Sequence, residues 1–276
     1  MKKVVLMVAA LSAMGVARAA MVSVEGTNTV GFVKMTVPAG SNTIVTVPFE
    51  ACLGTGSAGM LADMVATNGL TSDAANAASA DQLVVLTTNG ASLVYYYYWL
   101  KTGDGWTEIT TEQIMPDGGT ATLTPPAATN FPVARGLGFW IKRVAGSGSD
   151  LYLKGQVSSA KQSTLVNPGL NLVGYGSVET FSLNGSGIDW TGASGTNGIS
   201  ATTDRILVCN GDGTFTAYYY FVKREGSSSY YDQFANKWVE STSTGPALAT
   251  NSIPAGQGFW YHRRSSGSFT FRPDGQ

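Results

Sequence analysis

Charged residues, histidine and cysteine are all scarce in this chain of 276 residues. Asp, Glu, Lys and Arg together supply 13% of the positions, against roughly 25% in an average globular protein. The formal net charge of −1 provides no basic field for phosphates, so we exclude a nucleic-acid binder. One histidine and two cysteines offer few metal ligands or nucleophiles, and we therefore predict neither a metal site nor a cofactor.

Long apolar runs are absent as well, although apolar residues make up 43% of the chain. That share is enough for a packed core and excludes wholesale disorder. Beyond the N-terminal segment, no window approaches the roughly 18 consecutive apolar residues that a membrane-spanning helix needs. We therefore predict no membrane insertion of the mature chain.

The N-terminal segment 1–20 has the pattern of a secretory signal peptide. Two lysines precede the apolar stretch 4–16, which is too short for a membrane-spanning helix. The small side chains of Ala17 and Ala19 suit the −3 and −1 subsites of signal peptidase. We predict cleavage after Ala19 or Ala20 and a secreted, periplasmic or cell-surface protein; the alternative is an uncleaved N-terminal anchor. Cleavage leaves 14 basic against 18 acidic residues, a charge of −4.

Export also permits a disulfide between Cys52 and Cys209, because disulfides persist in oxidising compartments. Cys209 lies in the apolar, strand-like segment 204–209, whereas Cys52 lies among small residues. A bridge and two buried free thiols both stay open at this point.

Two parts of the chain align with one another. Residues 81–99 align without a gap on residues 204–222. A Gly-x-Gly-Phe-Trp motif at Gly136–Trp140 recurs at Gly256–Trp260. Because the motifs keep their order and nearly their spacing, we predict two copies of one unit.

The copies, residues 21–156 and 157–276, are predicted to be β structure. In each, an apolar run leads to Asn-Gly or Asp-Gly and then to a run ending in tyrosines, the pattern of a hairpin with a type I′ turn. We expect a second hairpin after each Gly-x-Gly-Phe-Trp motif. The best helical candidates are Ala58–Ala66 and Ala74–Ala80. The predicted fold is all-β, with two tandem, pseudo-symmetric repeats, each a sandwich or barrel-like, closely docked because no Pro/Gly-rich spacer separates them.

The tyrosine runs are the main candidate for a binding site. Successive side chains of a strand alternate between its faces, so Tyr95 and Tyr97 share one face and Tyr96 and Tyr98 the other. One face can be core, whereas the other is either covered by the sister copy or presents rings that stack on sugars. Both interpretations stay open. The candidate platform comprises Tyr95, Tyr96, Tyr97, Tyr98, Trp99, Tyr218, Tyr219 and Tyr220.

The Gly-x-Gly-Phe-Trp motif predicts a structural role. Glycines two apart beside a large aromatic pair fit a bulge or tight bend entering a strand, where the missing Cβ lets Trp pack across the backbone. Because the motif occurs in both copies, we interpret it as a folding determinant rather than an active site. Trp106 and Trp238 also occupy matching places.

Candidates for catalysis are few. His262 is followed by two arginines and aligns with Lys142, so we expect an exposed strand residue rather than a general base. Asp81 and Asp204 lie at equivalent strand starts, and no pair of carboxylates stands out for glycoside hydrolysis. No GxSxG motif supports a nucleophilic serine. We therefore predict no catalytic residue.

Three short motifs occur together along the mature chain: Val30-Gly-Phe-Val, Pro38-Ala-Gly-Ser-Asn-Thr and the two Gly-x-Gly-Phe-Trp strands. This combination resembles an uncharacterised family of exported β-rich proteins of Verrucomicrobia and related bacteria. The resemblance implies export and a periplasmic or surface setting, and it transfers no activity, ligand or site residue. Asn171-Leu-Val with the second Gly-x-Gly-Phe-Trp motif is also similar to accessory modules of bacterial extracellular proteins.

From these features we predict an exported, non-enzymatic structural or interaction protein of the cell envelope. Its expected partners are further copies of itself or other envelope components, because strands rich in valine and aromatics suit such packing. The alternative is a carbohydrate-binding module that holds a polysaccharide on the tyrosine runs. A hydrolase is less favoured, since no acids for it can be named.

Overall fold

The computed structural model describes residues 18–23, 29–49, 60–89, 92–114, 120–123, 126–133, 135–146, 150–157, 163–185, 188–198, 201–210 and 212–272. The fold is all-β, as predicted, and consists of antiparallel sheets. The helices are short, and two of them, α1 (Leu61–Met64) and η1 (Ala77–Ser79), lie within the two predicted helical segments. The third is η2 (Ser229–Phe234) in the second half.

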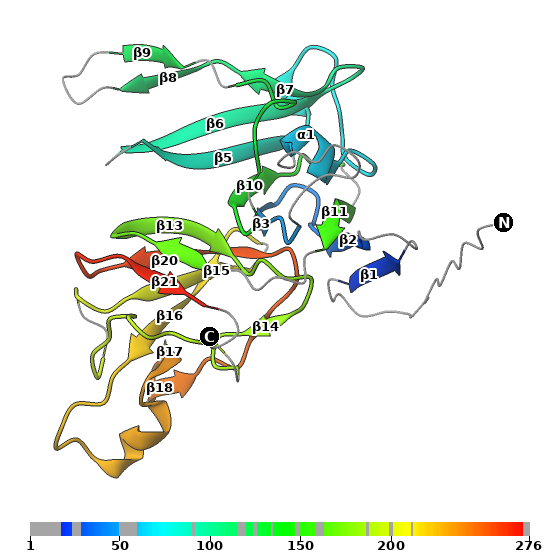
Figure 1. Ribbon diagram of the computed structural model, residues 1–276. Coiled ribbons are helices and arrows are strands. Elements are labelled where there is room, and N and C mark those ends of the chain that lie inside the picture. The colour runs from blue at the N-terminus through cyan, green and yellow to red at the C-terminus, as the bar shows by residue number, and fades with distance from the viewer. Residues whose placement is uncertain are drawn as a thin grey trace.

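The first half of the chain, residues 18–157, is a sandwich of two sheets with the main core between them (Figure 1). One layer has the strand order β3 (Asn42–Thr46), β10 (Gly138–Lys142), β5 (Gln82–Asn89), β6 (Ser92–Lys101) and β7 (Gly105–Ile109). The other layer has the order β1 (Arg18–Ser23), β2 (Thr29–Thr36), β11 (Asp150–Val157) and β4 (Val65–Ala66). A separate pair is formed by β8 (Thr111–Ile114) and β9 (Thr120–Leu123).

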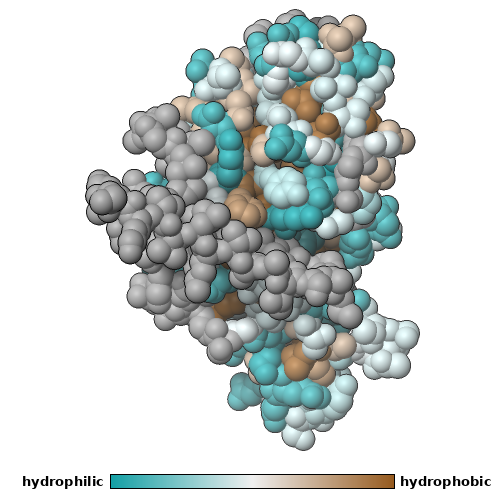
Figure 2. Space-filling view, turned by 90° about the vertical axis from the view of Figure 1, so that its right-hand side faces the viewer, coloured by the Kyte–Doolittle hydropathy of each residue, from teal (hydrophilic) through white to brown (hydrophobic). Residues whose placement is uncertain are grey.

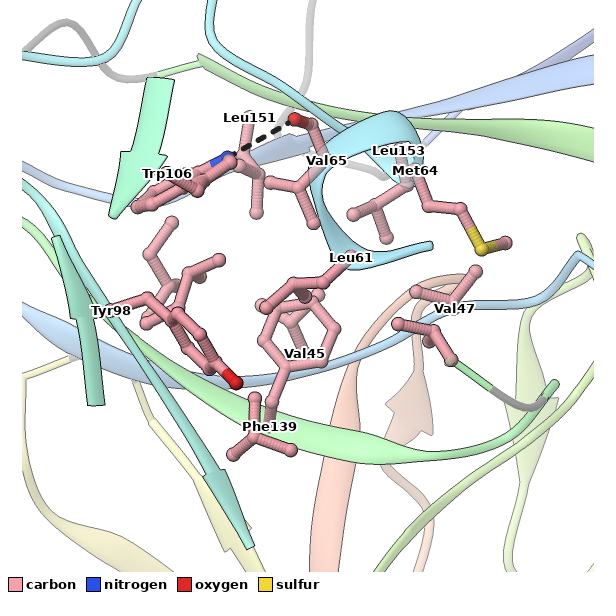
Figure 3. Close-up of a cluster of buried hydrophobic side chains, with 14 of the residues drawn as sticks. Val45, Val47, Leu61, Met64, Val65, Tyr98, Trp106, Phe139, Leu151 and Leu153 are labelled. Carbon is pink, nitrogen blue, oxygen red and sulfur yellow. Dashed lines mark hydrogen bonds between the residues drawn. The ribbon is translucent and has the colours of Figure 1, made fainter. Parts of the chain in front are cut away.

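Side chains from both layers and from α1 meet in this core (Figure 3). Phe139 of β10 and Leu153 of β11 come from opposite layers, and Leu61 of α1 lies between them; all three side chains have no exposed surface. The buried indole of Trp106 donates a hydrogen bond to the Val65 carbonyl at 3.4 Å, which ties β7 to the segment after α1. Apolar burial of this extent is the main stabilising contribution to such a domain.

The second half of the chain, residues 163–272, likewise consists of sheets packed around a core of its own. Its large sheet has the order β13 (Gly169–Gly174), β20 (Gly258–Arg263), β15 (Arg205–Cys209), β16 (Phe215–Phe221), β17 (Lys237–Thr242) and β18 (Gly245–Leu248). Two small sheets complete it, β12 (Thr164–Val166) with β21 (Phe269–Phe271) and β14 (Phe181–Ser182) with β19 (Ser252–Ile253). Rings from both small sheets enter the core, where Phe181 and Phe271 lie 6.2 Å apart between centroids.

The large sheets of the two halves have matching strand orders, with β3, β10, β5, β6 and β7 in the places of β13, β20, β15, β16 and β17. All described sheets are open, so the described part of the chain forms sandwiches and contains no closed barrel. That the halves are copies of one unit stays a prediction.

Two details of the sequence comparison are wrong. The hairpin from Gln82 to Trp99 is three residues longer than the hairpin from Arg205 to Tyr219, although both pairs are cross-strand partners. When the two hairpins are matched by their cross-strand partners, Tyr95 takes the place of Phe215 rather than Tyr218. The sequence alignment did not reveal this shift, because a run of similar aromatic residues aligns equally well in more than one register. The hairpin expected after each Gly-x-Gly-Phe-Trp motif does not form either, since β10 and β11, like β20 and β21, lie in different layers.

The two sandwiches touch along a seam between their large sheets, where β3 and β10 contact β13 and β20 (Figure 1). Ile44 and Leu86 of the first half form one apolar cluster with Leu172 and Cys209 of the second, and Trp140 and Trp260 pack against it. The closely docked arrangement is thus confirmed.

The view in Figure 2 shows one side of the molecule. Outside the residues drawn in grey, hydrophobic residues appear there as small patches among hydrophilic ones. Scattered apolar residues of this kind are ordinary for a protein surface.

Candidate functional site

Asp81 and Arg143 form a fully buried ion pair at the edge of the first core. Arg143 Nε lies 2.9 Å from Asp81 Oδ2, and both side chains have no exposed surface. The carboxylate also accepts hydrogen bonds from the backbone N–H groups of Thr71 and Val144. The guanidinium donates in addition to the Gly69 carbonyl at 2.8 Å. Buried charges are tolerated when their hydrogen bonds are satisfied in this way.

Asp204 and Arg263 form the same arrangement in the second half, with Arg263 Nη1 2.6 Å from Asp204 Oδ2. The Asp204 carboxylate accepts from the backbone N–H groups of Ser194 and Arg264, as Asp81 does from two loops. Here the Tyr261 hydroxyl donates a further hydrogen bond to Asp204 Oδ2 at 2.8 Å. This contact and burial, which is the main cause, raise the pKa of Tyr261.

These pairs were missed by the sequence analysis, which placed the two aspartates only at strand starts. A signal was present, because each arginine lies three residues after the Trp of a Gly-x-Gly-Phe-Trp motif, at 143 and 263. Each pair binds the loop before the central hairpin to the end of the motif strand. The chain leaves the large sheet at this point and crosses to the other layer. The two carboxylates therefore hold loops in place and do not face a cleft.

The Gly-x-Gly-Phe-Trp motif is structural, as predicted, but for a different reason at its second glycine. Gly136 and Gly256 have φ of 79° and 80°, a conformation that side chains disfavour. A Cβ on Gly138 would lie 2.7 Å from Leu172 Cγ, and a Cβ on Gly258 would lie 2.6 Å from Ile44 Cγ2. The second glycine thus lets the two large sheets approach each other at the seam, and it is the other half rather than the adjacent Trp that occupies the space.

The first tyrosine run has the predicted alternation of faces. Tyr96 and Tyr98 both make edge contacts with Phe131 on the core side, at centroid distances of 6.1 and 6.0 Å. Burial raises the pKa of Tyr98, whose hydroxyl donates to the Pro126 carbonyl. On the other face Tyr95 is 38% exposed and Tyr97 is half-buried. Tyr95 and Tyr97 therefore present ring surface on this outer face, whereas Tyr96, which is also half-buried, packs against the first core.

The second run is buried on both faces. Tyr218 and Tyr220 belong to the main core of the second half, with 2% and 7% of their surfaces exposed. Tyr219 is 5% exposed because Tyr231 and Phe234 of η2 cover the outer face of the sheet at that point. Trp99 of the first run is 8% exposed. These four rings are covered by protein, so the platform that they were predicted to form is reduced to the outer face of the first run.

Exposed or partly exposed rings gather instead on the outer faces near the seam. Trp140 lies edge-on to Phe215 of the other half at 6.0 Å and tilted to Trp260 at 6.4 Å. Phe215 is 39% exposed, and both tryptophans are half-buried. Both tryptophans were predicted as parts of a folding motif and Phe215 was not predicted as a site residue, because half-buried aromatic rings have the residue types of a core.

A group of basic residues lies on the outer face of the second large sheet. Arg205 of β15 is the cross-strand partner of His262 of β20. His262 is half-buried rather than exposed, and its pKa lies below the usual value because of burial, Arg264 and Arg205, with Asp204 opposing them. Among the described residues nothing accepts a hydrogen bond from the buried Nε of Arg205.

Cys209 is a buried free thiol, and its Sγ lies 3.4 Å from the Asn42 carbonyl across the seam. Cys52, its predicted disulfide partner, lies outside the described residues. In the described part of the chain no three His, Cys, Asp or Glu side chains gather as a metal-binding group would require. Of the helices described, none combines the length and apolar character of a membrane-spanning helix.

Comparison of the chain with protein-family models, with curated proteins and with solved structures gave no match. The geometry of the outer faces is therefore the basis on which a function is proposed.

Proposed function

We propose that this chain is an exported, non-enzymatic interaction protein of the bacterial cell envelope that binds polysaccharide on the outer faces of its two large sheets. One observation carries the proposal: Tyr95, Tyr97, Trp140, Phe215 and Trp260 keep part of their ring surface exposed on those faces. Flat aromatic surface with polar groups around it suits the apolar faces of sugar rings. The two buried aspartates, in contrast, are engaged in holding loops.

Export remains part of the proposal and rests on the N-terminal sequence. Strand β1 pairs with β2 from Arg18 opposite Lys34 to Ser23 opposite Thr29. The expected cleavage after Ala19 or Ala20 falls inside β1 and would leave 20–23 or 21–23 able to pair with β2. Mass spectrometry of the secreted protein tests this directly, because an intact N-terminus would contradict it.

A polysaccharide array probed with the exported form of the chain tests the binding proposal. We expect binding to at least one polysaccharide, weakened about tenfold or more in Tyr95→Ala and Phe215→Ala. Tyr230→Ala is the matched control, because Tyr230 is 53% exposed but lies on η2, away from the seam. Failure to bind any polysaccharide, or an equal loss in the control, would contradict the proposal.

A second candidate is a structural protein that assembles with copies of itself. The same exposed rings favour it, because a sheet face with partly exposed aromatic side chains can pack against an identical face. Sedimentation velocity over a wide range of protein concentration separates the two functions. Association that rises with concentration and disappears in Phe215→Ala, without any polysaccharide binding, would favour assembly instead.

A further inference from the structure

We propose that the outer face of the second large sheet carries a carboxylate-binding subsite, formed by Arg205, His262 and Arg264, which selects acidic over neutral polysaccharide. The inference rests on the proposed polysaccharide binding and specifies the class of sugar. A uronic acid, whose ring carries a carboxylate, is the ligand that this subsite fits.

The subsite is built by the pairing of adjacent strands. Arg205 on β15 lies directly opposite His262 on β20, so both side chains share the outer face. Arg264 follows two residues after His262, and its backbone N–H is fixed by a 2.8 Å hydrogen bond to Asp204 Oδ1. Burial lowers the pKa of His262 first, and the charges of Arg264 and Arg205 lower it further, while Asp204 opposes them.

The charge of Asp204 opposes that of the two arginines at His262, but its carboxylate pairs with Arg263. Asp204 faces inward, where it is 0% exposed and pairs with Arg263. Arg205 is half-buried, and no described residue accepts a hydrogen bond from its Nε. A guanidinium can hold a carboxylate through two parallel hydrogen bonds, which a neutral sugar cannot match.

An aromatic ring for the sugar lies on the same face. Trp260 comes two residues before His262 on β20 and is half-buried, so its indole and the imidazole point to the same side of the sheet. A pyranose ring over Trp260 would place its carboxylate toward the arginines. The chain as a whole has a net charge of −1, so general attraction would not hold a polyanion and a local cluster has to supply it.

The first half provides a natural contrast. There Lys142 takes the place of His262 and is paired with Gln82 instead of an arginine. Val144 takes the place of Arg264, and its N–H bonds to Asp81 Oδ1 as the N–H of Arg264 does to Asp204. A single exposed lysine therefore stands where the second half has two arginines and a histidine, and the first outer face should not distinguish acidic from neutral sugars.

Biolayer interferometry of the exported chain on immobilised polygalacturonate and on its fully methyl-esterified form tests the subsite. The two polymers share one backbone and differ in charge. We expect the acid form to bind at least about tenfold more tightly. Arg264→Gln, at an exposed position where folding is not at risk, and Arg205→Gln should each remove about tenfold of this preference. Lys142→Gln, the equivalent place in the first half, should change it less than about twofold.

Each other outcome has a distinct meaning. Equal binding of both polymers would contradict the carboxylate-binding subsite but not polysaccharide binding. If no polymer bound, either in this assay or on the array, both proposals would be contradicted. An equal loss in Lys142→Gln would show non-specific charge attraction. Dextran sulfate serves as a second anion, and binding as tight as that of polygalacturonate would overturn the choice of carboxylate. Thermal unfolding of each variant identifies a loss that comes from misfolding.

Discussion

The two halves of the molecule agree in their interiors and differ on their outer faces. Both large sheets have the same order of five strands, and both use a buried aspartate–arginine pair to fix the end of the motif strand. The connection from β6 to β7 has only residues 102–104, whereas that from β16 to β17 has residues 222–236 and contains η2. Interior positions are constrained by packing, so the differences that can serve recognition lie outside.

The two tyrosine runs differ in exposure because they lie three positions apart in matching hairpins: Tyr95 takes the place of Phe215, and Trp99 takes the place of Tyr219. Exposure at matching places is nearly the same, 38% and 39% in the first pair and 8% and 5% in the second. Phe221 stacks on Tyr231 at 5.8 Å and meets Phe234 edge-on at 5.9 Å, so η2 builds a small apolar cluster on the outer face of β16 and β17. The first half has only residues 102–104 at the corresponding connection, and Trp99 is nevertheless buried there. Its outer face remains aromatic through Tyr95 and Tyr97, while the second presents Arg205 and His262 beside the covered zone.

The largest expected effect comes from breaking the ion pairs. Asp81→Asn and Asp204→Asn each leave a buried guanidinium without its counter-charge, which costs about 3–5 kcal/mol of unfolding free energy. We expect the loss in Asp204→Asn to be at the upper end of this range, because the substitution also weakens the hydrogen bond from Tyr261. In the first half the position of Tyr261 is taken by Ile141, which makes no such bond. Urea unfolding measures both, and Asp212→Asn in an exposed turn is the control. A loss below about 1 kcal/mol for either variant would contradict the role assigned to the pairs.

Tyr261→Phe removes only the contact that separates the two pairs. The hydroxyl is buried and donates to a carboxylate, and such a bond contributes about 1.5–3 kcal/mol. We therefore expect the free energy of unfolding to fall by this amount, because Asp204 loses its additional donor while the apolar ring stays in the core. Tyr230→Phe on the exposed face of η2 should be neutral in the same urea titration. Equal stabilities of the wild type and Tyr261→Phe would show that the remaining donors suffice, as they do at Asp81.

The seam offers a test of how equivalent the two halves are. Gly138→Ala and Gly258→Ala each place a methyl group under 3.0 Å from a branched side chain of the other half, and overpacking of this kind costs about 1–3 kcal/mol. We expect losses within about 1 kcal/mol of each other, since the contacts are reciprocal. Gly198→Ala is the control, because nothing lies within 4 Å of its Cβ position. A large loss in one variant only would show that the seam is unequal on its two sides.

Much of the fold could be predicted from the sequence, because alternation and turn residues determine strands locally. The central hairpins, the short helical segments and the alternation of Tyr95 to Tyr98 all follow from such local rules. The corner after each motif strand could not be predicted in the same way. Val144 and the glycines after it are typical of a tight turn, and only the burial of Arg143 shows that the chain changes layer there.

The candidate site was harder to predict than the fold. Half-buried rings such as Trp140 and Trp260 have the residue types of a core, and only the seam shows which part of each stays exposed. The burial of Tyr219 depends on η2, a segment with no counterpart in the first half. Arg205 and His262 are 57 residues apart, so their contact is set by strand order and register rather than by any local pattern.

The smallest expected effect concerns the pH dependence that His262 adds to the second half. Burial, followed by Arg264 and Arg205, lowers the pKa of His262 from 6.5, while Asp204 acts in the opposite direction. The unfolded chain therefore takes up this proton more readily than the native one, so the free energy of unfolding should fall as pH decreases below about 6.5. Because the imidazole is partly solvated, we expect a change of a few tenths of a kcal/mol between about pH 7 and about pH 5. Comparison of the wild type with His262→Gln isolates it from the carboxylates that titrate in the same range. A steeper loss in His262→Gln than in the wild type would reverse the sign and mean that Asp204 outweighs the two arginines.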